Sequence, residues 1–225
     1  DDLARELSIS EDKAELLLPT AMIYHNIFEE TDAEFMWLSG ITICDGMAAD
    51  FAECKEHIVP AHPFSDDIIS VSRKLAERFC CDTEHIHQVE IAALKLFDAM
   101  RKANHLTKKD RLLLQIAAIL HNCGSFLNLN DIGENSYKIV TSTEIIGLSH
   151  QERMIVAYVI RYTTGDFPEY SEIKNEFSRE EYIKIAKLNA IPCLADAMDR
   201  SHQQKFTNFT VRKRGYDLTI TGQTL

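Results

Sequence analysis

His121 and Asn122 stand directly after an apolar segment, LLLQIAAIL, and are the residues of this chain whose chemistry is most informative. The segment is apolar nearly all round, which predicts a helix at the centre of the fold. A buried imidazole needs partners for both ring nitrogens, so His121 suits a metal site or a buried polar network. Asn122 offers a metal only a neutral carbonyl oxygen, whereas aspartate would supply an anionic one.

The surrounding pattern resembles the HD superfamily of metal-dependent phosphohydrolases, in which a His-Asp pair lies between an upstream histidine and a downstream aspartate. His85 in CDTEHIHQV and Asp196 in CLADAMDRSH stand at these two places. Members with two metals have further histidines, where this chain has Asn135 and Thr163. The resemblance therefore implies a vestigial metal site, with no catalytic residue and no cofactor expected in this chain, formed by His85, His121, Asn122 and Asp196.

Each of these residues also has a structural interpretation, which stays open at this point. His85 can cap or pack at the start of a helix, and Asp196 and Asp199 can cap neighbouring helices or pair with Arg200. A working metal site needs a cation and a charged cage to hold it. If the site functions after all, a divalent metal is the cofactor we expect.

The composition is that of a globular chain, with 225 residues, 45% of them hydrophobic. The formal net charge of −11 repels polyanions, so we expect neither DNA nor a membrane surface as a partner. The cysteines show no CxxC spacing, which indicates reduced thiols and a cytoplasmic location. Basic residues gather at 212–214, where we expect a solvated surface.

Local signals predict a mostly α fold. Helix starts are indicated by capping residues followed by acidic residues at Ser10, Ser65, Asp82, Thr107, Ser149 and Ser178. Pro192 should kink or break the last long helix just before Cys193. Strand signals occur in residues 35–44 and in residues 206–221, where Lys213-Arg214-Gly215 predicts a hairpin turn.

Longer motifs are similar to the C-terminal part of the exopolyphosphatase and guanosine pentaphosphate phosphatase family. They are SVSRKLAERFCCDTEHIHQVEIAALKLFDAM, LLLQIAAILHNCG, NSYKIV, GLSHQER and LADAMDRSHQQ, in the family's order. The resemblance implies three parts. Residues 1–58 would be the tail of an actin-like (ribonuclease-H-like) phosphatase lobe, a small α/β remnant, with a linker; 59–205 an HD-domain-like helical bundle; and 206–225 a C-terminal β-hairpin.

In this family the phosphatase chemistry belongs to a core that precedes the matching region, and we expect that core to lie outside this chain. Whether the chain itself is an enzyme therefore stays open. In the remnant, GITICDGMAAD stands at the family's Gly-Leu-Arg-Glu-Gly stretch, with Cys44 at the arginine position and Asp45 at the glutamate position. Cysteine cannot replace the bidentate oxyanion contact of an arginine.

The resemblance implies a non-catalytic C-terminal module of an exopolyphosphatase-like protein, whose parent removes terminal phosphate from polyphosphate or guanosine pentaphosphate. We expect it to contribute to ligand binding and to a homodimer. The arginines expected to bind phosphate are Arg73, Arg78, Arg161 and Arg200. Two alternatives stay open: a metal-dependent phosphohydrolase acting through His85, His121 and Asp196, and a pure protein-interaction scaffold.

Overall fold

A computed structural model describes residues 2–7, 9–31, 34–36, 40, 43–54, 64–206, 208–215 and 217–223. The chain divides into two compact units, Asp1–Pro60 and Ala61–Leu225. Within the described part of the first unit the elements are helices, α1 (Asp2–Glu6), α2 (Glu11–Glu30) and α3 (Ile43–Cys54). The strand predicted for residues 35–44 is wrong where the structure tests it, because Ile43 and Cys44 begin α3; residues 37–39, 41 and 42 lie outside the described residues.

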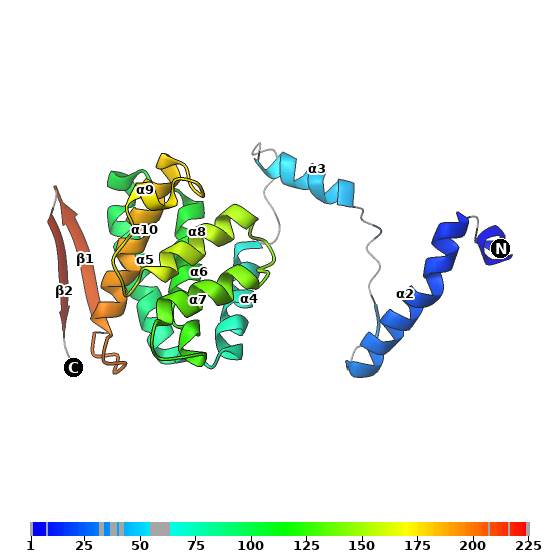
Figure 1. Ribbon diagram of the computed structural model, residues 1–225, viewed down its shortest axis with the longest axis horizontal. Helices are drawn as coiled ribbons and strands as arrows, with labels where there is room; N and C mark the ends of the chain where they lie inside the picture. The colour runs from blue at the N-terminus through cyan, green and yellow to red at the C-terminus, as the bar shows by residue number, and fades with distance from the viewer. Residues whose placement is uncertain are drawn as a thin grey trace. The chain divides into compact units, whose positions relative to one another are not determined.

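The second unit is a helical domain followed by a two-stranded hairpin (Figure 1). Its elements are α4 (Phe64–Arg78), α5 (Thr83–Asn104), α6 (Lys108–Leu120), the 3-10 helix η1 (Cys123–Phe126), α7 (Ile132–Ser142), α8 (His150–Arg161), α9 (Tyr170–Ile173), α10 (Arg179–Met198), β1 (Asn208–Arg214) and β2 (Asp217–Gln223). The fold is therefore mostly α with a C-terminal β-hairpin, as predicted.

Helix α6 lies at the centre of this domain, in contact with α4, α5, α8 and α10. Ile116, Ala117, Ala118, Ile119 and Leu120 are fully buried, which confirms the central placement predicted from the apolar segment. Burial of this kind supplies most of the stability of a helical domain. The end of α6 is thus a rigid place from which to position His121.

Capping boxes start α6, α8 and α10. Thr107, Ser149 and Ser178 each accept a hydrogen bond from a backbone amide three residues on, and the acidic side chain there returns one. Asp82 caps α5 by accepting from the amide of His85. These starts are as predicted, whereas α4 begins at Phe64, one residue before the predicted cap Ser65.

Helix α10 runs without interruption from Arg179 to Met198 and includes Pro192, so the prediction of a break before Cys193 is wrong, and the alternative of a kink stays a prediction. Pro192 is buried, and the contacts of α10 with α5, α6 and α8 hold its helix together despite the missing backbone donor. The last turn of α10 therefore keeps helical geometry where it carries Asp196.

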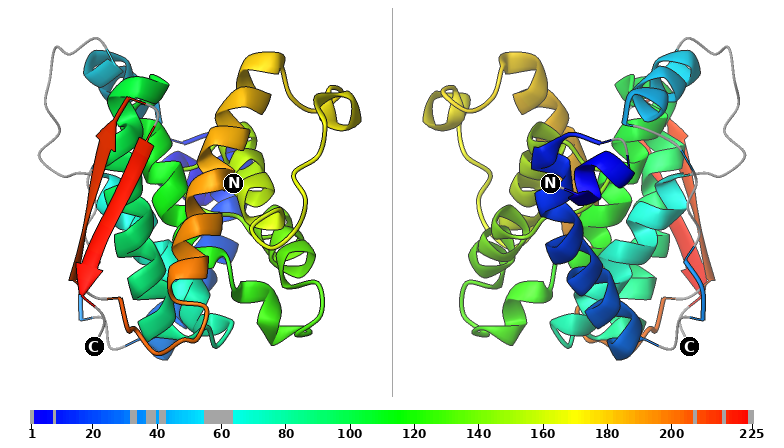
Figure 2. Two further views of the ribbon diagram at one scale, coloured as in Figure 1. Left: turned by 90° about the vertical axis from the view of Figure 1, so that its left-hand side faces the viewer. Right: turned by 90° about the vertical axis from the view of Figure 1, so that its right-hand side faces the viewer.

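The predicted hairpin is confirmed: β1 pairs with β2 antiparallel, with Arg214 opposite Asp217 and Gly215 in the turn at φ +59°. In both views of Figure 2 it lies along the outside of the helical domain beside α5. Phe209 is buried there, and the Lys95 ammonium lies 4.3 Å from its ring. Among the described residues no helix has the length and apolar character to cross a membrane.

Candidate metal and phosphate site

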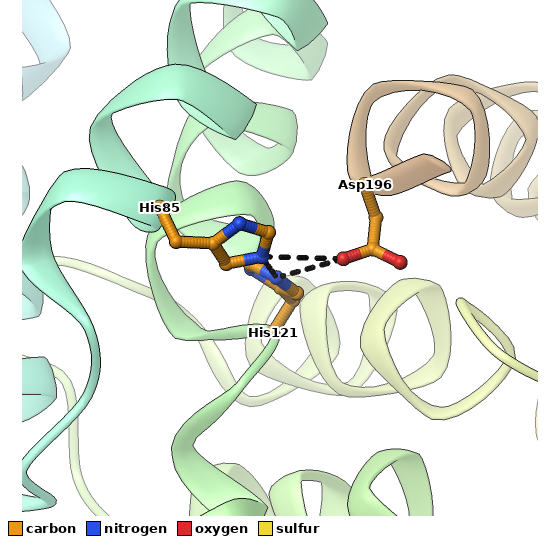
Figure 3. Close-up of side chains that lie close together, drawn as sticks. All are labelled: His85, His121 and Asp196. Atoms are coloured by element: carbon orange, nitrogen blue, oxygen red, sulfur yellow. Dashed lines mark hydrogen bonds and ion pairs between the residues drawn. The ribbon is translucent and has the colours of Figure 1, made fainter. Parts of the chain in front are cut away.

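Three side chains at the ends of three helices meet at one point of the domain (Figure 3). His85 lies in the first turn of α5, His121 directly follows α6, and Asp196 lies in the last turn of α10. The two imidazole Nε2 atoms are 3.2 Å apart, and Oδ1 of Asp196 lies 3.3 Å from Nε2 of His85 and 3.6 Å from Nε2 of His121. All three residues are buried.

Hydrogen bonds at the far side of each ring determine which nitrogen faces this point. Nδ1 of His85 lies 3.0 Å from Oδ2 of Asp199, and Nδ1 of His121 lies 2.7 Å from the carbonyl oxygen of Ala118. A carboxylate and a carbonyl are acceptors, so both Nδ1 atoms carry hydrogen. In the neutral rings each Nε2 therefore directs a lone pair toward Asp196, and three acceptors converge.

Three converging acceptors repel each other unless a positive charge lies between them. A proton on one Nε2 is one solution, and a metal cation is the other. A tetrahedral ion with bonds of about 2.1 Å separates its ligand atoms by roughly 3.4 Å. The observed separations of 3.2, 3.3 and 3.6 Å bracket that value, and two imidazoles with one carboxylate are a donor set of catalytic zinc sites. The residues present thus fit a single divalent cation.

The pKa shifts of the cluster agree with a shared positive charge. Burial disfavours the charged form of Asp196, but hydrogen bonds from His121 and His85 hold its pKa well below the ordinary value. Burial disfavours protonated His85 as well, yet the carboxylates of Asp196 and Asp199 raise its pKa above the ordinary value. The cluster therefore holds a carboxylate beside a readily protonated imidazole when no metal is bound.

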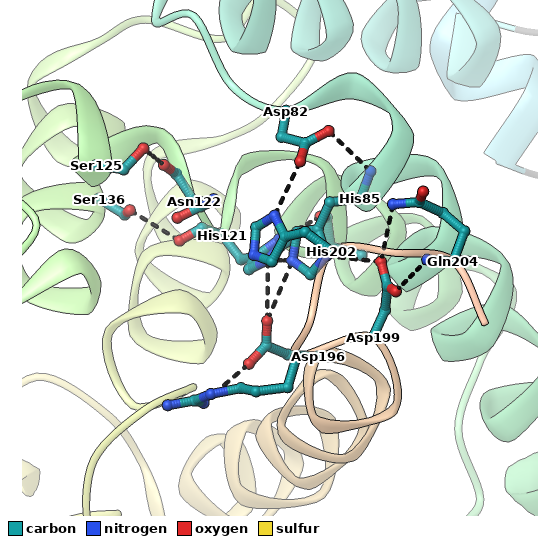
Figure 4. A network of polar contacts seen from close by, with 12 residues as sticks. Asp82, His85, His121, Asn122, Ser125, Ser136, Asp196, Asp199, His202 and Gln204 are labelled. Atoms are coloured by element: carbon teal, nitrogen blue, oxygen red, sulfur yellow. Dashed lines mark hydrogen bonds and ion pairs between the residues drawn. The ribbon is translucent and has the colours of Figure 1, made fainter. Parts of the chain in front are cut away.

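A second layer of polar residues holds the His85 ring (Figure 4). Oδ1 of Asp199 accepts a hydrogen bond from the backbone amide of Gln204 at 2.8 Å, which fixes the carboxylate that faces His85. The His202 ring stacks on the His85 ring with centroids 3.7 Å apart, and its Nδ1 lies 2.9 Å from Oδ2 of Asp82. Sequence reasoning missed these roles of Asp199, His202 and Asp82.

The residues that hold the backbone of His121 come from η1 and α7. The Ser136 hydroxyl donates to the carbonyl of His121 at 2.9 Å and accepts from the amide of Gly124 at 2.7 Å. Gly124 has no room for a side chain, because a Cβ there would collide with the backbone of Ile132 and Ser136. The start of α7 is thereby fixed against the end of α6.

The cluster opens into a pocket of about 180 Å³. Besides the three cluster residues, its walls are formed by Asn122, Ile132, Gly133, Thr163, Thr164, Arg200 and His202. The Arg200 guanidinium lies 3.4 Å from Oδ2 of Asp196 and is 74% exposed, so it can turn toward a ligand in the opening. Hydroxyl, amide and guanidinium donors around a cation position suit an oxyanion.

The pocket brings together some of the residues named from the sequence and leaves others apart. Asn122 and Thr163 line it, whereas Asn135 donates to the backbone carbonyl of Asn130 and is not among the lining residues. Thr163 donates its hydroxyl to the backbone of Val159. These three positions therefore supply no charged ligand.

The four arginines predicted to bind phosphate have different surroundings. Arg200 lines the pocket. Arg73 makes hydrogen bonds of 2.8 Å to both carboxylate oxygens of Glu90, and Arg161 lies 2.7 Å from Glu134 and 4.6 Å from the ring of Tyr137. Arg78 is exposed in the last turn of α4. Arg200 is thus the arginine that the structure associates with the cluster.

Comparison with known families gives a match over most of the chain. Residues 69–221 match the family model described as Ppx/GppA phosphatase, domain III. The matched range includes His85, His121 and Asp196, together with β1 and most of β2.

Proposed function

Since the chain belongs to the Ppx/GppA phosphatase family, we propose that it is a C-terminal module whose pocket binds the terminal phosphate of polyphosphate or a guanosine phosphate. In this proposal one divalent cation held by His85, His121 and Asp196 anchors the phosphate, and Arg200 contacts it from the rim. The convergence of three acceptors on one point is the observation that carries the proposal.

The sequence-based expectation of a vestigial, metal-free site depended on counting the missing ligands at Asn122, Asn135 and Thr163. The geometry favours the alternative of a bound cation, because three ligands with an open fourth position suffice for one cation. A cation there would supply positive charge to a phosphate oxygen. The second layer that fixes both imidazole tautomers is the kind that raises metal affinity.

Metal titration of the chelator-treated protein tests the site. We expect one equivalent of Zn²⁺ or Co²⁺ to bind, and His85→Ala, His121→Ala and Asp196→Asn each to weaken binding at least tenfold. His87→Ala is the matched control, because His87 lies two residues from His85 and is exposed. Absence of metal binding by the folded wild type would contradict the proposal and would favour a metal-free cluster in which a proton lies between the imidazole and carboxylate acceptors.

Phosphate binding is tested separately with labelled polyphosphate. We expect Arg200→Ala to weaken binding and Arg78→Ala, an exposed arginine in the last turn of α4, to leave it unchanged. Equal loss in the two variants would show that diffuse surface charge, and not the pocket, binds the ligand. The homodimer and the actin-like origin of residues 1–58 stay predictions.

A second candidate is hydrolysis of a phosphoester at the same cation. The open position that faces the pocket favours it, since a water or substrate oxygen could occupy that position. Against it stands Asn122, which is neutral where the related phosphohydrolases carry aspartate. We therefore favour binding without hydrolysis. Release of phosphate from polyphosphate by the metal-loaded chain, lost in Asp196→Asn, would establish the second candidate instead.

A further inference from the structure

Two buried thiols face each other beside the site. Sγ of Cys81 lies 3.4 Å from Sγ of Cys123, although 42 positions separate them in the sequence. Nothing in the proposed cation or phosphate binding uses either sulfur. A thiol pair in contact needs only a small movement to form a disulfide.

The backbone that presents Cys81 is a tight helix end. The amide of Cys80 donates to the carbonyl of Glu77 and that of Cys81 to Ala76, which closes α4. Cys80 takes the left-handed conformation at φ +50°, a conformation that favours glycine. Cys80 thereby points to solvent while Cys81 turns inward to Cys123.

The two sulfurs belong to the segments that carry the histidines. Cys81 immediately precedes Asp82, which caps α5 ahead of His85. Cys123 begins η1, two residues after His121, and its neighbour Gly124 is hydrogen-bonded to Ser136. A covalent bond between Cys81 and Cys123 would tie the start of α5 to the turn that follows α6.

We propose that Cys81 and Cys123 form a reversible disulfide on exposure to a peroxide, and that this bond shifts the two histidine-bearing segments relative to each other. In the first step the Cys81 sulfur attacks one peroxide oxygen, the O–O bond breaks, and a sulfenic acid and water result. The Cys123 sulfur then attacks the Cys81 sulfur, the S–S bond forms, and a second water leaves. Two thiols and one hydrogen peroxide thus give one disulfide and two waters.

The order of the steps follows from access. Cys81 keeps 7% of its surface exposed and Cys123 none, so peroxide reaches Cys81 first. The hydrogen bond with Cys123 also lowers the pKa of the Cys81 thiol, against the effect of burial. A disulfide has sulfurs about 2.05 Å apart, so closure brings the Cys81 and Cys123 sulfurs about 1.4 Å closer together.

Peptide mapping of the full chain after treatment with hydrogen peroxide tests the bond. We expect a Cys81–Cys123 crosslink that dithiothreitol reverses, at the expense of two titratable thiols. The crosslink should persist in Cys80→Ser and Cys193→Ser and be absent in Cys81→Ser. A crosslink that involves Cys80 instead, or oxidation of Cys81 no further than the sulfenic acid, would overturn the proposal.

Two further measurements test the effect on the domain. Oxidation should raise Tm by about 5 °C or more in the wild type, because the bond closes a long loop, and should not do so in Cys81→Ser. The imidazole ¹⁵N resonances of His85 and His121, recorded in metal-free protein, should shift on oxidation of the wild type. A crosslink without such a shift would overturn the coupling, and neither measurement depends on metal or phosphate binding.

Discussion

Asp199 determines what His85 can do. Its carboxylate holds the Nδ1 hydrogen of His85, and its other oxygen is held by the amide of Gln204. The pair resembles the carboxylate–histidine arrangement that orients metal ligands in many sites. Because Asp199 is buried and negatively charged, it also raises the pKa of His85 together with Asp196.

Asp199→Asn should therefore destabilise the metal-free protein in a pH-dependent way. Folding raises the pKa of His85, so the protonated imidazole stabilises the fold. This stabilisation is fully present below about pH 6.5 and is lost as the pH rises through the pKa of His85 in the folded protein. Asparagine removes the negative charge of Asp199, so we expect the free energy of unfolding in urea to fall by about 1–3 kcal/mol at pH 6 and by less at pH 8.5. Asp98→Asn, in an exposed pair with Arg111, is the control. A loss that grows with pH would contradict this account.

Asn122 is the residue that, in our proposal, lets the pocket bind phosphate without hydrolysing it. Restoring the aspartate should not by itself produce an enzyme. The Thr163 hydroxyl is already donated to the backbone of Val159, and Asn135 does not line the pocket, so neither position supplies a further metal ligand. We expect Asn122→Asp with added Zn²⁺ or Mn²⁺ to release no more p-nitrophenol from p-nitrophenyl phosphate than the wild type does. Metal-dependent turnover that disappears on adding Asp196→Asn would show this expectation to be wrong.

At the scale of elements, the segment between α6 and α7 helps to position His121. Gly124 lets the backbone of η1 approach the start of α7, and Ser136 joins the two through the carbonyl of His121. Gly124→Ala should cost more than about 2 kcal/mol of unfolding free energy in urea, because backbone atoms block the added methyl group. Gly165→Ala has nothing described within 4 Å and should stay near wild type. Equal midpoints for the two variants would mean that η1 can move away at little cost.

Elements that depend on local signals could be predicted from the sequence. Thr107, Ser149 and Ser178 mark helix starts because a capping box involves four consecutive residues. His85, His121 and Asp196 could be grouped because their motifs resemble those of a known superfamily. The stacking of His202 on His85, the contact of Cys81 with Cys123 and the fit of Gly124 could not, since each joins residues that tertiary packing alone brings together.

At the scale of the molecule, the second unit has its own core. The buried apolar residues that form that core run from Ile68 to Phe209, all within the unit Ala61–Leu225. A chain of residues 61–225 should therefore have the same free energy of unfolding in urea as the helical domain of the full chain, within about 0.5 kcal/mol. Circular dichroism of both chains provides the comparison. A truncated chain that fails to fold would show that residues 1–60 contribute to the core.

Charge distribution over the whole molecule decides how polyphosphate binding responds to salt. The net charge of −11 opposes the approach of a polyanion, whereas a cation at the cluster and Arg200 attract it at one place. Each phosphate contact with a cationic side chain releases condensed counterions, so affinity should fall as salt rises, but with the small slope of one or two contacts. Fluorescence titration with labelled polyphosphate at three salt concentrations measures that slope. A slope corresponding to six or more contacts would show that polyphosphate binds an extended basic surface and would contradict binding at the pocket.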